Sequence, residues 1–214
     1  MNDDKPFWSD AGTGAGDPRL CAAATQRNRE PILEVLSRIL PRRGTVLEIA
    51  SGTGEHAVWL ARHLRPLIWQ PSDPDPAMRR SIAAHRADAH CPTLAAPLEL
   101  DVTAPDWPIE EAAAVVCINM VHIAPWAASE GLMAGAARLL EATAPLYLYG
   151  PYKRGGKHTA ASNEAFDRSL RSQNPDWGLR DEEAVVALAK RSGFDHLETV
   201  EMPANNLSVI FRRR

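Results

Sequence analysis

Three acidic side chains stand at the ends of three apolar runs of the sequence. Glu48 lies in TVLEIA, Asp73 ends LIWQPSD, and Asp101 lies in APLELDV. Each run has the length and composition of a buried strand, and a helix-like segment separates each run from the next, at residues 54–64 and 76–88. Open α/β sheets bind ligands in the crevice at the carboxyl ends of their strands. The three acids are therefore predicted to face one ligand.

The turn after the first strand narrows the choice of ligand. A triphosphate-binding loop has the pattern GxxxxGK[ST], but no lysine follows Gly54. A dinucleotide fingerprint has the pattern GxGxxG, and its positions here hold Ala50, Gly52 and Glu55. A carboxylate at Glu55 would also repel a diphosphate at a helix N-terminus, where anions are otherwise favoured. The turn favours a ligand without phosphate.

S-adenosylmethionine (SAM) meets this condition, because it carries an ammonium group, a sulfonium, a ribose diol and an adenine but no phosphate. Glu48 could bind the ammonium group directly or through a water molecule. Asp73 could accept hydrogen bonds from the ribose hydroxyls, and Asp101 from the adenine amino group. Each acid alone could instead be a helix cap or a turn residue, but the ordered set of three favours the ligand.

In these stretches the chain resembles class I SAM-dependent methyltransferases, and among them the small methyltransferase-like protein 26 family. The resemblance extends from about Ala22 to Phe211. It is carried by RNREPIL, LEIASGTGEHA, WQPSDPD, LELDV, CINMVHIAP, YGPYK, SNEAFDRSLRSQNPDWGLRD and MPANNLSVIFR. It implies SAM as the cofactor, S-adenosylhomocysteine as the product, and a seven-stranded sheet whose C-terminal hairpin supplies the antiparallel strand.

The resemblance assigns Glu48, Gly52, Asp73 and Asp101 to cofactor-binding positions of the class. The sequence departs from the class at Ala50, where the usual residue is the first glycine of the motif. A methyl group is expected to fit there if the backbone angle φ stays negative. The full set predicted to bind the cofactor is Arg27, Glu48, Ala50, Gly52, Gly54, Asp73, Asp101 and Asn119.

The residues predicted to act in catalysis are Asn119, His122 and Tyr152. Methyl transfer is an in-line displacement that depends mainly on positioning, which can supply ~7–11 kcal/mol of the barrier. Asn119 could bind the methionine part of SAM or the acceptor, and His122 could take a proton from a hydroxyl or amine. Tyr152 could line the acceptor pocket or donate a hydrogen bond. Alternatively, His122 bonds loop carbonyls and Tyr152 is a packed aromatic.

Other side chains have a less specific pattern. Arg27 could bind the SAM carboxylate with both guanidinium nitrogens, or could be an ordinary surface arginine. His56 could reach the cofactor, although a structural role is favoured. Residues 151–180 are long for a connection in an α/β domain and are predicted to be a lid or a substrate segment. Within them Arg180 could pair with Asp181 to fix a helix start, or could contact the substrate.

The elements that must position these residues follow an alternating pattern of strands and helices. This pattern predicts an α/β fold: a doubly wound, mostly parallel, seven-stranded sheet with a C-terminal antiparallel hairpin at PANN. Residues 1–20 are predicted to be a flexible leader, and 21–214 a single domain. Pro31 is expected in the first turn of a helix, Ser129 at a helix N-cap, and Asp181 as the cap of a late helix.

Composition narrows the classes of partner. The 214 residues carry a net charge of −3 and no basic stripe, so neither nucleic acid nor a membrane is expected as a partner, and the acceptor is predicted to be a small molecule. The three cysteines are scattered, and no ligand spacing predicts a metal site. A cytoplasmic location is expected. The alternatives are a non-catalytic SAM-binding sensor or interaction protein and, less favoured, a nicotinamide-dependent oxidoreductase.

Overall fold

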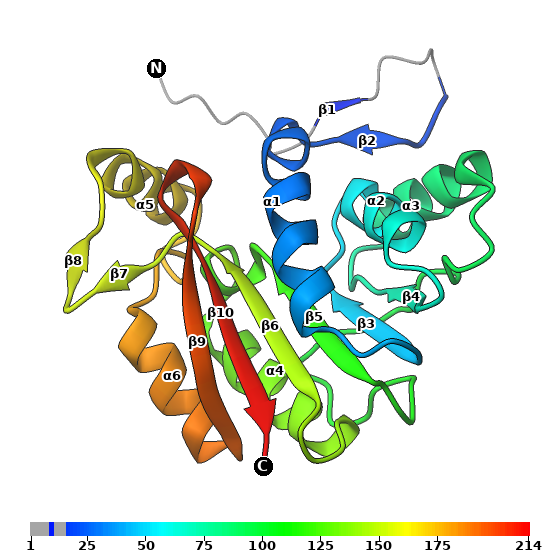
Figure 1. Cartoon of the computed structure of the whole chain (residues 1–214). Helices are drawn as coiled ribbons and strands as arrows, with labels where there is room; N and C mark the ends of the chain where they lie inside the picture. Colours follow the sequence, from blue (N-terminus) through cyan, green and yellow to red (C-terminus); the bar gives the residue numbers. More distant parts are fainter. Residues whose placement is uncertain (1–8, 11–15) are drawn as a thin grey trace. The chain divides into compact units, whose positions relative to one another are not determined.

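The computed structural model describes residues 9, 10 and 16–214, and the chain divides into two compact units, Met1–Asp101 and Val102–Arg214 (Figure 1). Each unit has its own strands and helices. Of the leader predicted at residues 1–20, residues 1–8 and 11–15 lie outside the described residues.

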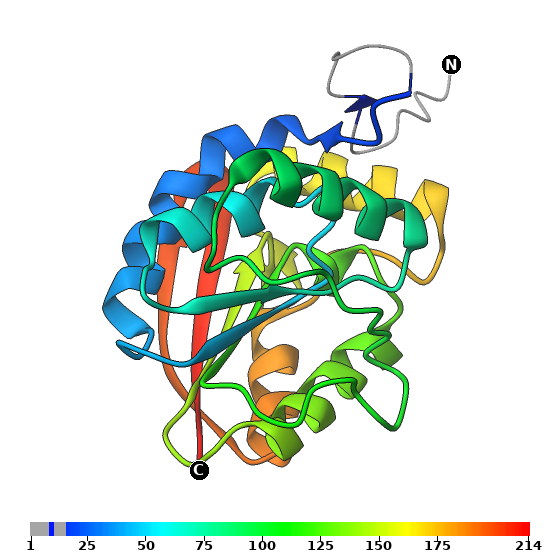
Figure 2. The ribbon, with the colours of Figure 1, turned by 90° about the vertical axis from the view of Figure 1, so that its right-hand side faces the viewer.

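The first unit alternates strands with helices. It contains β1 (Ser9–Asp10), β2 (Leu20–Cys21), α1 (Ala23–Ile39), β3 (Thr45–Ile49), α2 (Glu55–His63), β4 (Ile68–Pro71) and α3 (Pro76–Ala89). Strand β1 pairs with β2, and β3 runs parallel to β4 with Glu48 opposite Pro71. Helix α2 packs against both α1 and α3 (Figure 2). Two parallel strands joined through a helix form the crossover unit of α/β folds.

Helix α1 begins earlier than the sequence predicted. It starts at Ala23, so Pro31 lies inside the helix and not in its first turn. The prediction for Pro31 is therefore wrong. The preceding segment is rich in residues that favour helix, which extends the helix toward the N-terminus. Because proline has no N–H group, the carbonyl of Arg27 lacks its usual donor four residues later in the helix. The helix is nevertheless held on the core by Ile32 and Leu36, which are buried.

The third predicted strand is not formed. The segment APLELDV has only one isolated bridge to the end of β4, between Ser72 and Leu98. Pro97 has no N–H group to continue a ladder, and the side-chain amide of Gln70 instead donates to a carbonyl of this segment at 2.6 Å. Asp101 therefore follows irregular chain and is exposed, so the prediction that it ends a strand is wrong.

The second unit combines parallel and antiparallel pairing. It contains β5 (Ala114–Ile118), η1 (Met120–His122), α4 (Trp126–Leu139), β6 (Pro145–Gly150), β7 (Lys153–Arg154), β8 (Lys157–His158), α5 (Ala161–Gln173), α6 (Glu182–Arg191), β9 (Phe194–Met202), η2 (Pro203–Asn205) and β10 (Asn206–Arg213). Strand β5 runs parallel to β6, and β10 lies antiparallel between β6 and β9 (Figure 1). The hairpin predicted at PANN is confirmed.

The α/β fold class with a C-terminal antiparallel hairpin is confirmed, with one correction. The first unit supplies the main strands β3 and β4, and the second supplies β5, β6, β9 and β10, so the described residues form six main strands rather than seven. The missing strand is the proline-containing segment before Asp101.

Two predicted helix caps differ from the structure. Helix α4 begins at Trp126 after Pro125, so Ser129 is a fully buried residue within the helix and not its N-cap. The N-cap of α6 is Asp181, as predicted, but its side chain makes no capping hydrogen bond. Its carboxylate accepts instead from the Gly156 N–H at 2.8 Å. Neighbouring backbone thus competes with a helix end for a short acidic side chain.

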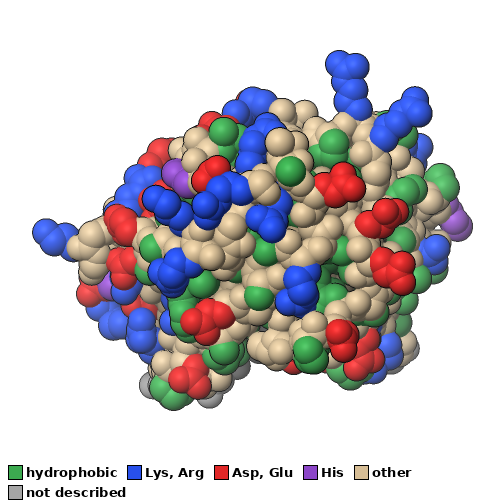
Figure 3. Space-filling model, turned by 90° about the horizontal axis from the view of Figure 1, so that it is seen from below, with side chains coloured by type: hydrophobic (Ala, Val, Ile, Leu, Met, Phe, Trp, Pro, Cys, Tyr) green, Lys and Arg blue, Asp and Glu red, His purple; other side chains and the backbone are tan. Residues whose placement is uncertain are grey.

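On the face of the molecule shown in Figure 3, basic and acidic side chains are interspersed. Across residues 9, 10 and 16–214, no helix combines the length and the hydropathy needed to cross a membrane.

Candidate functional site

Glu48 is the most deeply buried acid among the predicted site residues. It lies near the end of β3 with 1% of its surface exposed. The indole Nε1–H of Trp69, on the neighbouring strand β4, donates to Glu48 Oε2 at 2.9 Å. Burial raises the pKa of Glu48 from 4.5 to about 7, and the charge of Asp73 adds to this, while hydrogen bonds from Trp69 and Ser51 offset part of it. Near neutral pH this carboxyl group is therefore partly protonated.

Asp73 follows β4 and organises the glycine turn. Its Oδ2 accepts from the Gly52 N–H and its Oδ1 from the Asp75 N–H, both at 2.9 Å. Burial raises the pKa of Asp73, and these backbone hydrogen bonds oppose the rise. Each carboxylate oxygen has lone pairs for more than one hydrogen bond, so the group retains acceptor capacity for a hydroxyl pair. The structure thus brings Asp73 within electrostatic reach of Glu48.

The turn between β3 and α2 has an unusual backbone. Ala50 has φ of +52°, so the condition stated for a methyl group to fit there, a negative φ, is not met. A left-handed residue with a side chain costs about 1–2 kcal/mol, and such strain concentrates at functional sites. Gly52 and Gly54 also have positive φ. A Cβ at Gly54 would lie 2.9 Å from the Ile82 Cα, whereas one at Gly52 would meet no described atom within 4 Å.

The segment before α1 is fastened to this turn. Glu55 Oε2 accepts from the Ala22 N–H at 2.6 Å and from the Thr53 hydroxyl. The Ser81 hydroxyl donates to the Thr53 carbonyl at 2.7 Å and accepts from the Leu20 N–H at 2.9 Å. Glu55, the acid that argued against a dinucleotide, thus has a structural role, which no pattern in the sequence predicted.

Two further predicted residues of the first unit lie on α1 and α2. His56 Nε2 and Asn28 Oδ1 are 2.8 Å apart, and burial lowers the pKa of His56 to about 4. This neutral, bonded imidazole agrees with the structural role favoured for it. Arg27 is exposed on α1. Its predicted contact with a ligand carboxylate stays a prediction.

Trp69 was not singled out from the sequence, although it is the direct partner of Glu48. A buried indole needs an acceptor for its N–H group, and Glu48 is the acid of the strand predicted beside it. Together, these two facts could have predicted the contact between Trp69 and Glu48 from the sequence.

In the second unit, the segment after β5 carries Asn119 and His122. Asn119 has φ of +67°, and its N–H donates to the Tyr149 carbonyl at 2.8 Å. His122 is 3% exposed, and its ring lies edge-on to that of Phe166, with 5.7 Å between ring centroids. Burial, and then the charge of Arg180, lower the pKa of His122 to about 3. Such an imidazole is neutral at physiological pH and is a weak proton acceptor.

Tyr152 is 1% exposed, and in the part of the chain that the structure describes its hydroxyl has no hydrogen-bond partner. Burial raises its pKa. An unsatisfied buried hydroxyl costs about 1–3 kcal/mol, so this group is available as a donor. Its predicted role beside an acceptor is not tested by these contacts.

The ends of the long segment at 151–180 meet. The Lys153 N–H donates to the Arg180 carbonyl at 2.9 Å. The Arg180 guanidinium donates to the carbonyls of Ala124 at 2.8 Å and Asp176 at 2.7 Å, with a longer bond of 3.3 Å to Val121. The predicted local pair of Arg180 with Asp181 is not what these contacts show. Arg180 instead fastens the segment to the loop after β5, within the second unit.

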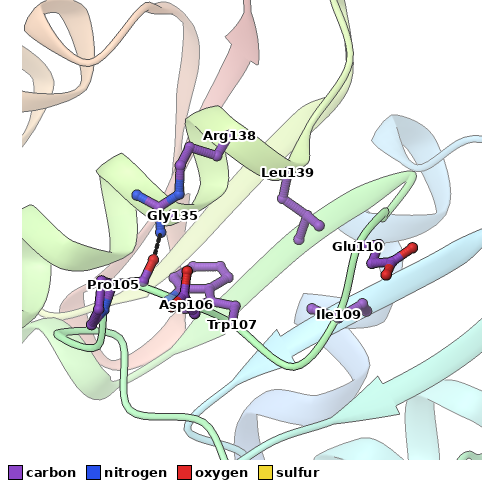
Figure 4. A pocket seen from close by; sticks show the side chains of 8 residues that line it. All are labelled: Pro105, Asp106, Trp107, Ile109, Glu110, Gly135, Arg138 and Leu139. Atoms are coloured by element: carbon purple, nitrogen blue, oxygen red, sulfur yellow. Dashed lines mark hydrogen bonds between the residues drawn. The ribbon is translucent and has the colours of Figure 1, made fainter.

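A separate hollow of about 200 Å³ lies beside α4 (Figure 4). The Trp107 ring rests against Gly135, where an added Cβ would be 2.0 Å from the ring, and Arg138 donates to the Pro105 carbonyl at 2.9 Å. None of the predicted site residues lines this hollow.

Comparisons with known proteins agree with the fold. The family described as "Protein of unknown function (DUF938)" matches residues 19–213. Among solved structures, mitomycin 7-O-methyltransferase MmcR is similar with a TM-score of 0.75 and 15% identity, over 90% of this chain and 55% of that one. An O-methyltransferase family protein from Burkholderia thailandensis gives 0.76 and 17%, over 89% and 57%. Human N-acetylserotonin methyltransferase in complex with SAM gives 0.69 and 13%, over 89% and 52%.

The chain spans about half the length of these solved structures. At such identities the likeness establishes the fold. It does not carry over the acceptors that those proteins methylate.

Proposed function

This chain belongs to the DUF938 family of proteins of unknown function, and we propose that it is a methyltransferase that uses SAM. The observation that carries the proposal is the turn after β3, which has positive φ at Ala50, Gly52 and Gly54 and lies between the acids Glu48 and Asp73. The similarity of the fold to solved methyltransferases supports it. The narrower resemblance to the methyltransferase-like protein 26 family is part of the proposal.

Each acid of the first unit receives one role. Glu48, in its ionised form, binds the ammonium group of SAM. Asp73 accepts from the ribose hydroxyls while it holds the turn through Gly52. The open space beside the Gly52 Cα lets the backbone approach the ligand. Arg27 and Asp101 are the proposed contacts of the carboxylate and of the adenine amino group.

We assign the acceptor side to residues 102–214 and the acceptor to the class of small molecules. The sulfonium of SAM is itself a good leaving group, so the protein contributes mainly by positioning the nucleophile. His122 is too weak a base to remove a proton efficiently at its low pKa. We therefore give His122 and Asn119 a positioning role, and Tyr152 the role of hydrogen-bond donor. Residues 21–214 are proposed to act as a single domain, with 151–180 as the acceptor segment.

The test is isothermal titration of the purified protein with SAM, S-adenosylhomocysteine and NADH. SAM and its product should bind, and NADH should not. Asp73→Ala should weaken SAM binding at least tenfold, or about 1.4 kcal/mol. The matched control is Asp88→Ala, which removes an exposed acid of α3 from the same unit. Absence of SAM and S-adenosylhomocysteine binding by the folded protein would refute the assignment.

Binding alone does not establish methyl transfer. With binding shown, incubation with SAM and fractionated metabolites should yield S-adenosylhomocysteine in at least one fraction. Binding without turnover in every fraction would favour a SAM-binding sensor.

A further inference from the structure

The pair formed by Glu48 and Trp69 is an unusual way to bury a carboxyl group. Both side chains are almost fully buried, on the adjacent parallel strands β3 and β4. The indole Nε1–H is fixed by the packing of a large ring, so its bond to Oε2 at 2.9 Å determines how the carboxyl group is turned. A methyl or phenyl side chain at position 69 could fill space but could not orient the acid.

Glu48 has no basic partner among residues 9, 10 and 16–214, where no ion pair joins it to a lysine, arginine or histidine. The Ser72 hydroxyl, which lies nearby, donates to the backbone carbonyl of Glu48 and not to its side chain. A buried charge without a partner is strongly unfavourable, which favours the protonated form of this group until a cation arrives.

The charged groups around Glu48 also favour its protonated form. Asp73, after β4, is the one charged group that acts on it in the described first unit, and its negative charge favours the protonated form. His56 on α2 is bonded to Asn28 on α1, and its low pKa keeps it neutral. Arg79 acts on Asp73 and Arg29 on His56, but among the described residues no positive charge acts on Glu48, which is therefore able to neutralise an incoming cation.

We propose that Trp69 is a positioning residue of the cofactor site, and that the ammonium group of the ligand binds Glu48 by displacing its proton. In this step the carboxyl O–H bond breaks, the proton passes to solvent, and an ammonium N–H···O bond forms in its place. No electron transfer is involved. The inference rests on the proposed function for the identity of the ligand, but the carboxyl–indole pair can be tested without any ligand.

The first experiment follows the indole N–H signals of the 15N-labelled protein by NMR between pH 5 and 9. The chain has six tryptophans, and the Trp69 signal is identified in Trp69→Phe or by sequential assignment. The Trp69 signal should shift with a midpoint near pH 7 and should stop shifting in Glu48→Gln. Trp107, which lies in the second unit, serves as the internal control. A Trp69 signal that stays constant over this range overturns the proposal.

The second experiment counts protons. SAM is titrated into the protein at pH 6, where an α-amino group stays charged. The titration is done in phosphate and in Bis-Tris, two buffers of this pH range whose ionisation enthalpies differ. Close to one proton should be released for each SAM bound by the wild type, and markedly less by Glu48→Gln. Trp69→Phe should bind SAM several-fold more weakly, with a changed proton count.

The outcomes separate the two proposals. Failure of SAM to bind refutes the function, while the NMR titration still tests the pair. Binding of SAM with no proton release refutes the displacement step and leaves the function standing. A merely structural role for Trp69 would lower stability without altering the number of protons released.

Discussion

Replacing Glu48 by glutamine should stabilise the empty protein, and the gain should increase with pH. Glutamine keeps the size of the side chain and an oxygen that can accept from the Trp69 indole. It removes only the ability to ionise. Because Glu48 is buried and the described part of the chain offers it no basic partner, ionisation of Glu48 destabilises the folded state.

The size of this destabilisation follows from the pKa of Glu48. Folding raises this pKa from 4.5 to about 7, and each unit of difference in pKa between the unfolded and the folded chain corresponds to about 1.4 kcal/mol. Between these two values the unfolded chain has released the proton and the folded chain still holds it, so the wild type loses stability as pH rises. The free energy of unfolding of Glu48→Gln should therefore exceed that of the wild type by little near pH 4.5 and by about 3 kcal/mol above pH 7.

Urea unfolding of both proteins at several pH values between about 4.5 and 8 measures this difference directly. The titration of His56 and His122 is common to both proteins and cancels in the difference. Glu30→Gln, an exposed change on α1, is the matched control and should show no comparable pH trend. A Glu48→Gln variant that is no more stable than the wild type at pH 8 would refute the reasoning.

Three further predictions concern stability. Gly135→Ala should lower the free energy of unfolding in urea by about 1–3 kcal/mol, because the new Cβ would lie 2.0 Å from the Trp107 ring. An increase, which helix propensity alone predicts, would contradict this. In the wild type the pKa of His56 is lowered to about 4, so between pH 6.5 and 4 the unfolded chain takes up a proton that the folded chain does not, and the free energy of unfolding falls. His56→Gln should therefore lose less stability over this pH range, and an unchanged slope of the free energy of unfolding against pH contradicts this. Ser81→Ala should cost about 1–2 kcal/mol and speed tryptic cleavage after Arg19, because the Leu20 N–H loses its acceptor; unchanged cleavage contradicts this.

The sequence predicted the parts of the fold in which local pattern and tertiary structure agree. The run TVLEIA is apolar enough to be a buried strand, and PANN marks a hairpin because its residues tolerate a tight turn. The positions of the glycine turn and its two flanking acids could be predicted from the sequence for the same reason. Strand, turn and helix are contiguous there, and few distant contacts are needed to place them.

The errors arose where a distant contact or a single backbone angle decides the outcome. The segment ending at Asp101 alternates like a strand, but Pro97 interrupts its pairing with β4. His122 resembles a free loop base in the sequence, whereas Phe166, 44 positions later, covers its ring. No local pattern indicates burial of that kind. The positive φ of Ala50 could not be predicted from the sequence either, because alanine usually avoids positive φ.

Glu48 and Asp73 were both predicted to bind the ligand, Glu48 its ammonium group and Asp73 its ribose hydroxyls, and the structure places them in different surroundings. Asp73 receives two backbone N–H groups, which favour its charged form, and it stabilises the turn. Glu48 receives an indole and lacks a cation, so its charge lowers the stability of the empty protein. Natural proteins give up stability where function requires it. Glu48→Gln should therefore stabilise the empty protein and weaken SAM binding together, and a variant that leaves SAM binding unchanged would remove the reason to assign Glu48 to the ligand.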